Sequence, residues 1–162
     1  MTELKYLFLY FPLAITLHNI EEAIWLPQWS FYAKKYHRPV NKDEFRFAVL
    51  LITALAYIST FLIMTFSNID LFKYFYFGFL GAMIMNTFFP HLVATILLKR
   101  YAPGLATGIL LLIPINTLII YLAVKDGFIN LDDVILSSLI VGILLLGSLP
   151  FLFKLGAKLI NY

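Results

Sequence analysis

The sequence contains no cysteine and few charged residues, and both absences restrict what the protein can be. Without cysteine the chain has no disulfides, no thiolate metal site and no thiol nucleophile. Charged residues make up 13% of its 162 residues, about half the share of a soluble domain. Hydrophobic residues make up 62%, and the mean hydropathy is +0.89. We therefore predict a membrane protein, and its net charge of +3 does not indicate a nucleic-acid partner.

Long apolar runs define the predicted fold. About 20 apolar residues are needed to cross a hydrocarbon core ~30 Å thick. We predict an all-α, polytopic integral membrane bundle that forms a single transmembrane domain over residues 1–162. Its five transmembrane helices are expected at residues 4–26, 45–66, 71–98, 105–124 and 131–153. The polar, basic stretch 28–44, which includes His37, is expected to form an interfacial loop. The expected location is the cell membrane, in contact with the lipid bilayer.

Lysine and arginine predict the orientation of these helices. Cytoplasmic loops of membrane proteins carry an excess of basic residues. The 28–44 loop, Arg46, the connection after span three and the C-terminal end together hold nine basic residues, whereas the opposite side holds three. Five spans with the N-terminus outside and the C-terminus in the cytoplasm satisfy every loop.

Three titratable residues interrupt the first predicted span. His18, Glu21 and Glu22 lie within an arc of ~100° on a helix, and Trp25 lies in the same arc. A charged side chain at mid-membrane costs roughly 3 kcal/mol or more. This face must therefore point into protein or water.

A second histidine, His91, lies in span three at nearly the depth of His18, because the two spans run in the same direction. Thr87 lies one turn before it on the same face. Pro90 removes a backbone hydrogen bond and should kink the helix. On an ideal helix Asn86 points about 140° away from His91, and a kink can change that direction.

Other polar residues in the spans are candidates for a substrate pocket. Arg46, near the inner end of span two, is the expected charge partner of one carboxylate. Ser137 and Ser138 in span five are expected to allow close helix packing. The predicted pocket residues are Trp25, Arg46, Tyr57, Asn86, Thr87 and Asn116.

The sequence resembles a family of small membrane proteins that is named for a histidine, two spacer residues and a glutamate pair, the HXXEE family. His18-Asn19-Ile20-Glu21-Glu22 matches that name, and residues 85–108 resemble the family's second block. The resemblance covers the chain from residue 10 to about residue 120. It implies which residues matter and assigns no reaction. The residues of the second block that carry the resemblance are Asn86, His91, Tyr101, Pro103 and Gly104.

Two imidazoles and two carboxylates at one depth match the ligands of a divalent metal. Histidine nitrogen and glutamate oxygen suit Zn²⁺ or Fe²⁺. We therefore predict His18, Glu21, Glu22 and His91 as metal ligands. Glu21 or Glu22 can instead act as the catalytic base, because one of two close carboxylates should have a raised pKa. The predicted function is an intramembrane enzyme acting on an apolar or lipid-like substrate, by hydrolysis with a metal or isomerisation without one.

Three other interpretations stay open at this point. The polar cluster can be a structural ion-pair network without catalysis. His18 and His91 can hold a haem, although two glutamates beside one histidine make that site too acidic for an easy fit. The titratable groups can relay protons in a proton-coupled transporter of small solutes. A chain this small would serve as a transporter most readily as a homodimer.

Overall fold

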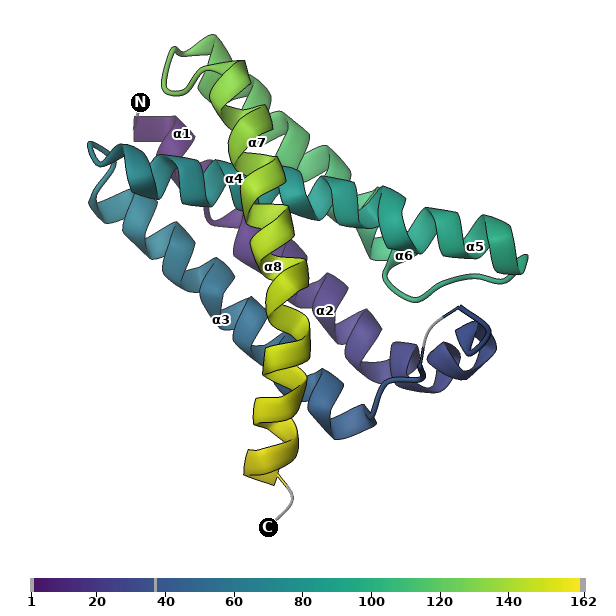
Figure 1. Cartoon of the computed structure of the whole chain (residues 1–162). Coiled ribbons are helices and arrows are strands. Elements are labelled where there is room, and N and C mark those ends of the chain that lie inside the picture. Colours follow the sequence, from purple (N-terminus) through teal and green to yellow (C-terminus); the bar gives the residue numbers. More distant parts are fainter. Residues whose placement is uncertain (1, 37, 161–162) are drawn as a thin grey trace.

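The structure is a computed structural model that describes residues 2–36 and 38–160, so the expectation for His37 lies outside the described residues. Within these ranges every regular element is helical (Figure 1). In chain order the elements are α1 (Thr2–Leu7), α2 (Tyr10–Trp29), η1 (Ser30–Ala33), α3 (Lys42–Thr65), α4 (Asp70–Asn86), η2 (Thr87–Leu92), α5 (Val93–Leu98), α6 (Leu105–Thr107), η3 (Gly108–Leu112), α7 (Ile113–Lys125) and α8 (Leu131–Ile160).

Four helical stretches in the described residues are long and apolar enough to cross a membrane. They are α3, the stretch from α4 through α5, the stretch from α6 through α7, and α8. The prediction of five such helices was wrong for the span at 4–26. The helix is interrupted at residues 8–9, between α1 and α2. Helix α2 also carries one imidazole, one asparagine amide and two carboxylates, which make it too polar to count as a membrane span. The predicted orientation stays a prediction.

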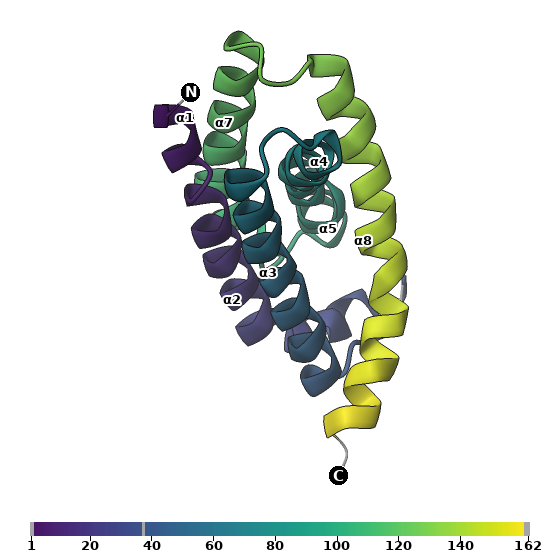
Figure 2. The ribbon, with the colours of Figure 1, turned by 90° about the vertical axis from the view of Figure 1, so that its left-hand side faces the viewer.

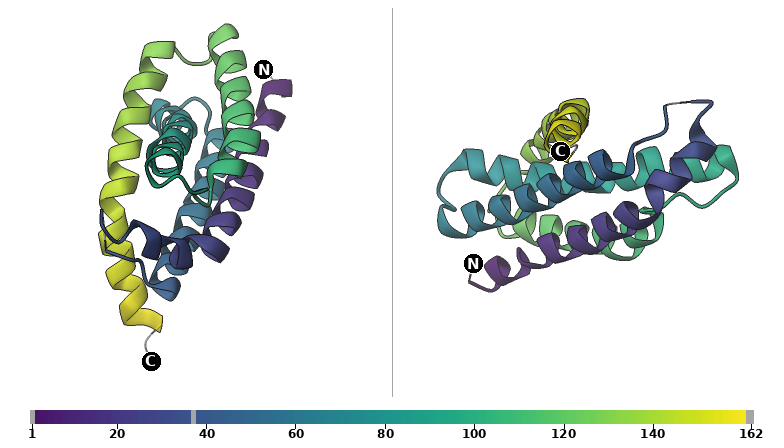
Figure 3. Two further views of the ribbon diagram at one scale, coloured as in Figure 1. Left: turned by 90° about the vertical axis from the view of Figure 1, so that its right-hand side faces the viewer. Right: turned by 90° about the horizontal axis from the view of Figure 1, so that it is seen from below.

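Helix α4 is the central element of the bundle. Figure 2 shows it nearly end-on, with α3 and α7 on one side and α8 on the other. Its side chains from Tyr76 to Met83 are all buried. Helices α2 and α3 run side by side, as Figures 1 and 3 both show. Because α2 lies against α3 and close to α4, the polar residues of α2 can be enclosed by protein.

Helices α4 and α8 cross at a contact between small residues. A Cβ atom added to Gly78 would lie 2.6 Å from the carbonyl oxygen of Ser137, and one added to Gly81 would overlap the side chain of Ser138. Both serines are buried. Small residues let two backbones approach closely in a membrane, so the packing role predicted for the two serines is confirmed.

Replacing Gly81 by leucine is expected to lower the free energy of unfolding by about 1–3 kcal/mol, because the side chain would force α8 away from α4. Gly147→Leu, on the partner helix α8, is the control, because a Cβ there meets nothing within 4 Å. Equilibrium unfolding in detergent, followed by circular dichroism, measures both variants. Equal stability of the two variants would contradict the close α4–α8 contact.

Two prolines in α2 have no N–H to donate to the backbone carbonyl four residues before them. In each case a side chain from another helix donates to that carbonyl instead. Pro12 cannot bond the carbonyl of Phe8, which instead accepts from the Tyr76 hydroxyl at 3.0 Å. Pro27 cannot bond the carbonyl of Ala23, which accepts from Arg46 Nε at 3.0 Å. Arg46 was expected beside a carboxylate. It donates instead to the Ala23 carbonyl, which has no N–H partner in its own helix because Pro27 has no N–H.

Candidate metal centre

Three titratable side chains from two separate helical segments converge in the bundle. His18 and Glu22 lie one turn apart on α2, and His91 comes from η2. Glu22 Oε1 lies 2.9 Å from His91 Nε2 and 3.6 Å from His18 Nε2. Both imidazoles are buried, and one ligand atom from each residue lies within 4.8 Å of the others. The predicted convergence of the two histidines with a glutamate is confirmed.

Asn86 adds a fourth polar group to this cluster. Its Nδ2 lies 3.1 Å from His91 Nε2 and 3.4 Å from His18 Nε2. The helix is interrupted at Phe89, whose φ of −131° and ψ of 116° are not helical, next to Pro90. This kink turns His91 back toward Asn86, which an ideal helix would not do.

The ligand atoms of His18, Glu22 and His91 lie close enough to one another to hold a metal ion, all within 4.8 Å. Zinc–nitrogen and zinc–oxygen bonds of about 2.0–2.1 Å place neighbouring ligand atoms about 3.3–3.4 Å apart. The four separations given above are 2.9, 3.1, 3.4 and 3.6 Å. An asparagine amide can turn over to present its oxygen instead of its nitrogen. The two imidazoles and the carboxylate are ligand types that suit Zn²⁺ or Fe²⁺, and the Asn86 side chain lies beside them.

The other carboxylate of the motif, Glu21, lies outside this group and has partners of its own. Its Oε1 accepts from the Tyr101 hydroxyl and from the Gly104 N–H at 2.9 Å. Its Oε2 accepts from the N–H and the hydroxyl of Thr107, at 3.1 and 2.6 Å. Both oxygens of this predicted ligand are thus turned toward the segment that follows α5 and away from the ligand group of Glu22.

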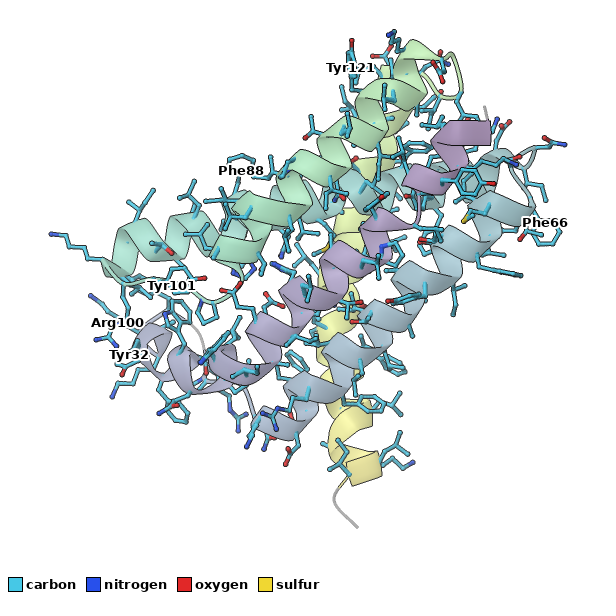
Figure 4. All side chains as sticks on the ribbon, turned by 180° about the vertical axis from the view of Figure 1, so that it is seen from behind. Tyr32, Phe66, Phe88, Arg100, Tyr101 and Tyr121 are labelled. Atoms are coloured by element: carbon cyan, nitrogen blue, oxygen red, sulfur yellow. The ribbon has the colours of Figure 1, made fainter. Side chains whose placement is uncertain are left out.

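The loop at residues 99–104 contacts α2 through a hydrogen bond and η1 through a cation–π interaction. The Tyr101 hydroxyl donates to Glu21, and the Arg100 guanidinium lies 3.7 Å from the centre of the Tyr32 ring. Figure 4 shows these labelled side chains where the loop meets the end of α2 and η1. Burial, and then the hydrogen bond to Glu21, raise the pKa of Tyr101 to about 12. The phenol is therefore a permanent donor at neutral pH.

Thr107 connects Glu21 to His18 and favours one of the two tautomers of that imidazole. The one hydroxyl hydrogen of Thr107 goes to Glu21 Oε2 at 2.6 Å. The same hydroxyl oxygen lies 3.1 Å from His18 Nδ1, and with its hydrogen on the carboxylate it favours the tautomer in which Nδ1 donates. In the neutral ring this leaves the lone pair on Nε2, the atom that faces Glu22 and Asn86.

Gly104 lets the loop approach both histidines. Its φ is +95°, a conformation that residues with a side chain rarely adopt. A Cβ atom here would lie 2.7 Å from His91 Cε1 and 3.0 Å from His18 Cε1. Any larger residue would therefore push the loop away from the two imidazoles.

Three members of the cluster, Glu22, Asn86 and His91, line a cavity of about 660 Å³, whereas His18 is not among its lining residues. Residues of α2, η1, α3, α4, η2, α5 and α8 line this cavity, and most are apolar. The polar side chains in its wall include those of Glu22, His91, Asn86 and Asn19. Trp29 also lines it, and its indole nitrogen is buried without a hydrogen-bond partner among the described residues.

Asn86 is the predicted pocket residue that the structure brings to this cavity. Trp25 is 56% exposed and lies beside a separate outer groove, and Tyr57 is 46% exposed on α3. Thr87 and Asn116 are buried, and each donates to a backbone carbonyl of α4. In the structure Thr87 and Asn116 therefore use backbone acceptors, and Trp25 and Tyr57 lie on the exposed surface.

Sequence reasoning missed two polar residues around the site. Thr107 was not singled out, although it lies inside the second block of the family resemblance and contacts both Glu21 and His18. Asn19, the first spacer residue of the motif, donates to Thr53 on α3 at 2.7 Å. This bond helps to hold the motif helix against α3.

Comparisons with known proteins agree with the motif. The family described as "Protein of unknown function with HXXEE motif" matches residues 9–119, which include His18, Glu22, Asn86, His91 and Thr107. The chain is 51% identical over 153 residues to "Uncharacterized protein YrkK" of Bacillus subtilis (strain 168), covering 94% of this chain and 97% of the relative. No solved structure matches the chain. This protein therefore belongs to the HXXEE family.

Proposed function

We propose that this protein is a metal-dependent, hydrolase-like enzyme of the cell membrane that acts on an apolar or lipid-like substrate. The observation that carries the proposal is the meeting of His18 with Glu22 and His91, two residues that line a largely apolar cavity. These three residues would hold a divalent ion, with Asn86 beside it. A pocket of a few hundred Å³ with few polar groups is typical of a site for a small apolar ligand.

The protonation of His18 supports metal binding. A ligating histidine usually donates its other N–H to a neighbouring group that fixes the ring. Here Thr107, itself donating to Glu21, is that acceptor, and the free lone pair of His18 points toward Glu22. The glutamate pair of the motif thus divides its roles. Glu22 lies among the ligand atoms, and Glu21 orients one of the histidines.

The residues of the chain suggest how an ester or amide would be hydrolysed. Held by these residues, Zn²⁺ or Fe²⁺ would supply the Lewis acidity for activation of a water and polarisation of a carbonyl. Both contacts of Glu22 with the imidazoles use Oε1, so Oε2 can accept the proton of the attacking water. That proton then passes to the leaving group as the acyl bond breaks, while the hydroxyl stays on the acyl carbon. The apolar cavity holds the hydrocarbon part of the substrate and excludes water.

A haem fits this site poorly. The two imidazole rings are 5.3 Å apart, and both Nε2 atoms contact the same Glu22 and Asn86 side chains. Glu22 and Asn86 would both have to leave these positions for the two Nε2 atoms to bind one haem iron. A structural ion pair has one observation in its favour, the 2.9 Å contact between His91 and Glu22, which a protonated imidazole would also make.

Metal analysis of the purified protein tests the proposal. We expect about one equivalent of zinc or iron per chain, and a Co²⁺-substituted form with the visible spectrum of a tetrahedral site. His18→Ala, Glu22→Ala and His91→Ala should each lose this metal, because each removes one of three ligands. His37→Ala is the control for loss of a histidine elsewhere in the sequence.

Two results would contradict the metal-dependent enzyme. One is protein that stays metal-free when refilled with Zn²⁺, Fe²⁺ or Co²⁺. The other is metal that is retained in all three ligand variants. Metal-free protein that also acidifies vesicles under a solute gradient would favour the transporter.

A further inference from the structure

The cavity opens on an exposed apolar surface between α5 and α8. Several residues that line it are also largely exposed: Phe89 64%, Leu97 62%, Ile143 70% and Leu146 53%. The first two belong to the stretch Asp70–Leu98 and the others to α8, and both stretches are apolar enough to cross a membrane. In Figure 1, α5 and the C-terminal half of α8 run apart from the point where α8 crosses α4. The mouth of the cavity is therefore bordered by helical stretches that are long and apolar enough to cross a membrane.

The charges in the cavity wall restrict the ligand. Among the described residues that line it, Glu22 is the one acidic residue, and neither lysine nor arginine is present. Proteins recognise phosphate and carboxylate groups mainly through arginine and lysine. A ligand with a phosphate head would lack such a partner here, whereas a neutral carbonyl group could meet the Asn86 amide and the imidazole of His91.

The size of the cavity restricts the ligand further. A volume of about 660 Å³ lies within the range of pockets for a drug-sized molecule. It suits a single hydrocarbon chain with a small head group and is small for a two-chain lipid.

We propose that a neutral amphiphile with one hydrocarbon chain and one ester or amide carbonyl enters this cavity from the bilayer, between α5 and α8. The carbonyl comes to rest beside Glu22, Asn86 and His91, and the chain lies along the apolar wall toward the open side. This inference names the substrate class for the proposed function and rests on it. Binding itself does not require the metal.

Quenching of Trp29 fluorescence tests this proposal. The chain has two tryptophans, so Trp25→Phe leaves Trp29, which lines the cavity, as the only one. A dibrominated methyl stearate added to this metal-free variant in detergent should quench it saturably. Unbrominated methyl stearate should reverse the quenching by competition. A dibrominated phosphatidylcholine should give no saturable quenching.

Two substitutions that fill the cavity provide the specificity test. Gly142 on α8 and Ala94 on α5 both line it. Phenylalanine at either position should lower the binding affinity for the ester at least about tenfold. Gly147→Phe, on α8 but not among the lining residues, is the control and should leave binding unchanged. Using both walls keeps the test valid if one variant fails to fold.

Unchanged binding in a folded Gly142→Phe or Ala94→Phe variant would overturn the proposed entry and site. Saturable quenching by phosphatidylcholine, with the affinity of the ester, would overturn the proposed ligand class. Because the measurement uses metal-free protein and no turnover, it separates this inference from the proposed enzyme. Protein that binds no metal could still bind the ester, and protein that does not bind the ester could still hold the metal.

Discussion

Glu21→Ala is expected to lower the free energy of unfolding by about 3–5 kcal/mol, far more than the loss of the neighbouring Glu22. The Glu21 carboxylate accepts from two backbone N–H groups and two hydroxyls. Without it, the N–H groups of Gly104 and Thr107 lose a charged acceptor in a buried place, and each unpaired donor costs about 1–3 kcal/mol. Equilibrium unfolding in detergent, followed by circular dichroism, measures the loss.

The comparison with Glu22→Ala makes this prediction specific. Glu22 contacts the imidazoles, so its alanine variant should keep most of the stability and lose the metal. Asp126→Ala removes an exposed carboxylate after α7 and serves as the control for net charge. If Glu21→Ala and Glu22→Ala lost equal stability, the division between a structural and a ligating carboxylate would be wrong.

This division shows how far the sequence can define the site. Helical spacing places His18, Glu21 and Glu22 on one face, and that inference holds for all three. A common face of ~100° is nevertheless wide enough for two sets of neighbours. The neighbours of each carboxylate depend on where the loop after α5 lies. The close approach of this loop to α2 requires the positive φ of Gly104. Spacing within one helix carries no information on that approach.

The fold was predictable to a similar degree. Long apolar runs identify the four helices that can cross a membrane, but length alone also suggested a fifth. The failure came from polar residues that protein, rather than lipid, surrounds. Arg46 shows the same limit, because charge complementarity favoured a carboxylate as its partner. A proline four residues after Ala23 was the available signal, since it leaves that carbonyl free for Arg46.

Thr107→Val is expected to weaken metal binding about 10–100-fold, the usual effect of losing a group that orients a ligating histidine. Valine keeps the shape of threonine but removes the hydroxyl that accepts from His18 Nδ1. The imidazole can then carry its proton on Nε2 and donate it to Glu22, which blocks the lone pair needed for the metal. Co²⁺ titration, followed by its visible spectrum, measures the affinity.

Thr107→Ser separates orientation from packing, because serine restores the hydroxyl and loses only a methyl group. We expect its metal affinity to stay within about threefold of the original. Nitrogen-15 NMR of the histidine side chains gives a second measurement that needs no metal. His18 should carry its proton on Nδ1 in the original and the serine variant, and at least partly on Nε2 in the valine variant. An unchanged tautomer in Thr107→Val would show that Glu21 and Thr107 hold the loop without orienting His18, even if stability falls. A changed tautomer with unchanged Co²⁺ affinity would instead mean that the Nε2 atom of His18 is not a ligand, and the metal site would then need another donor.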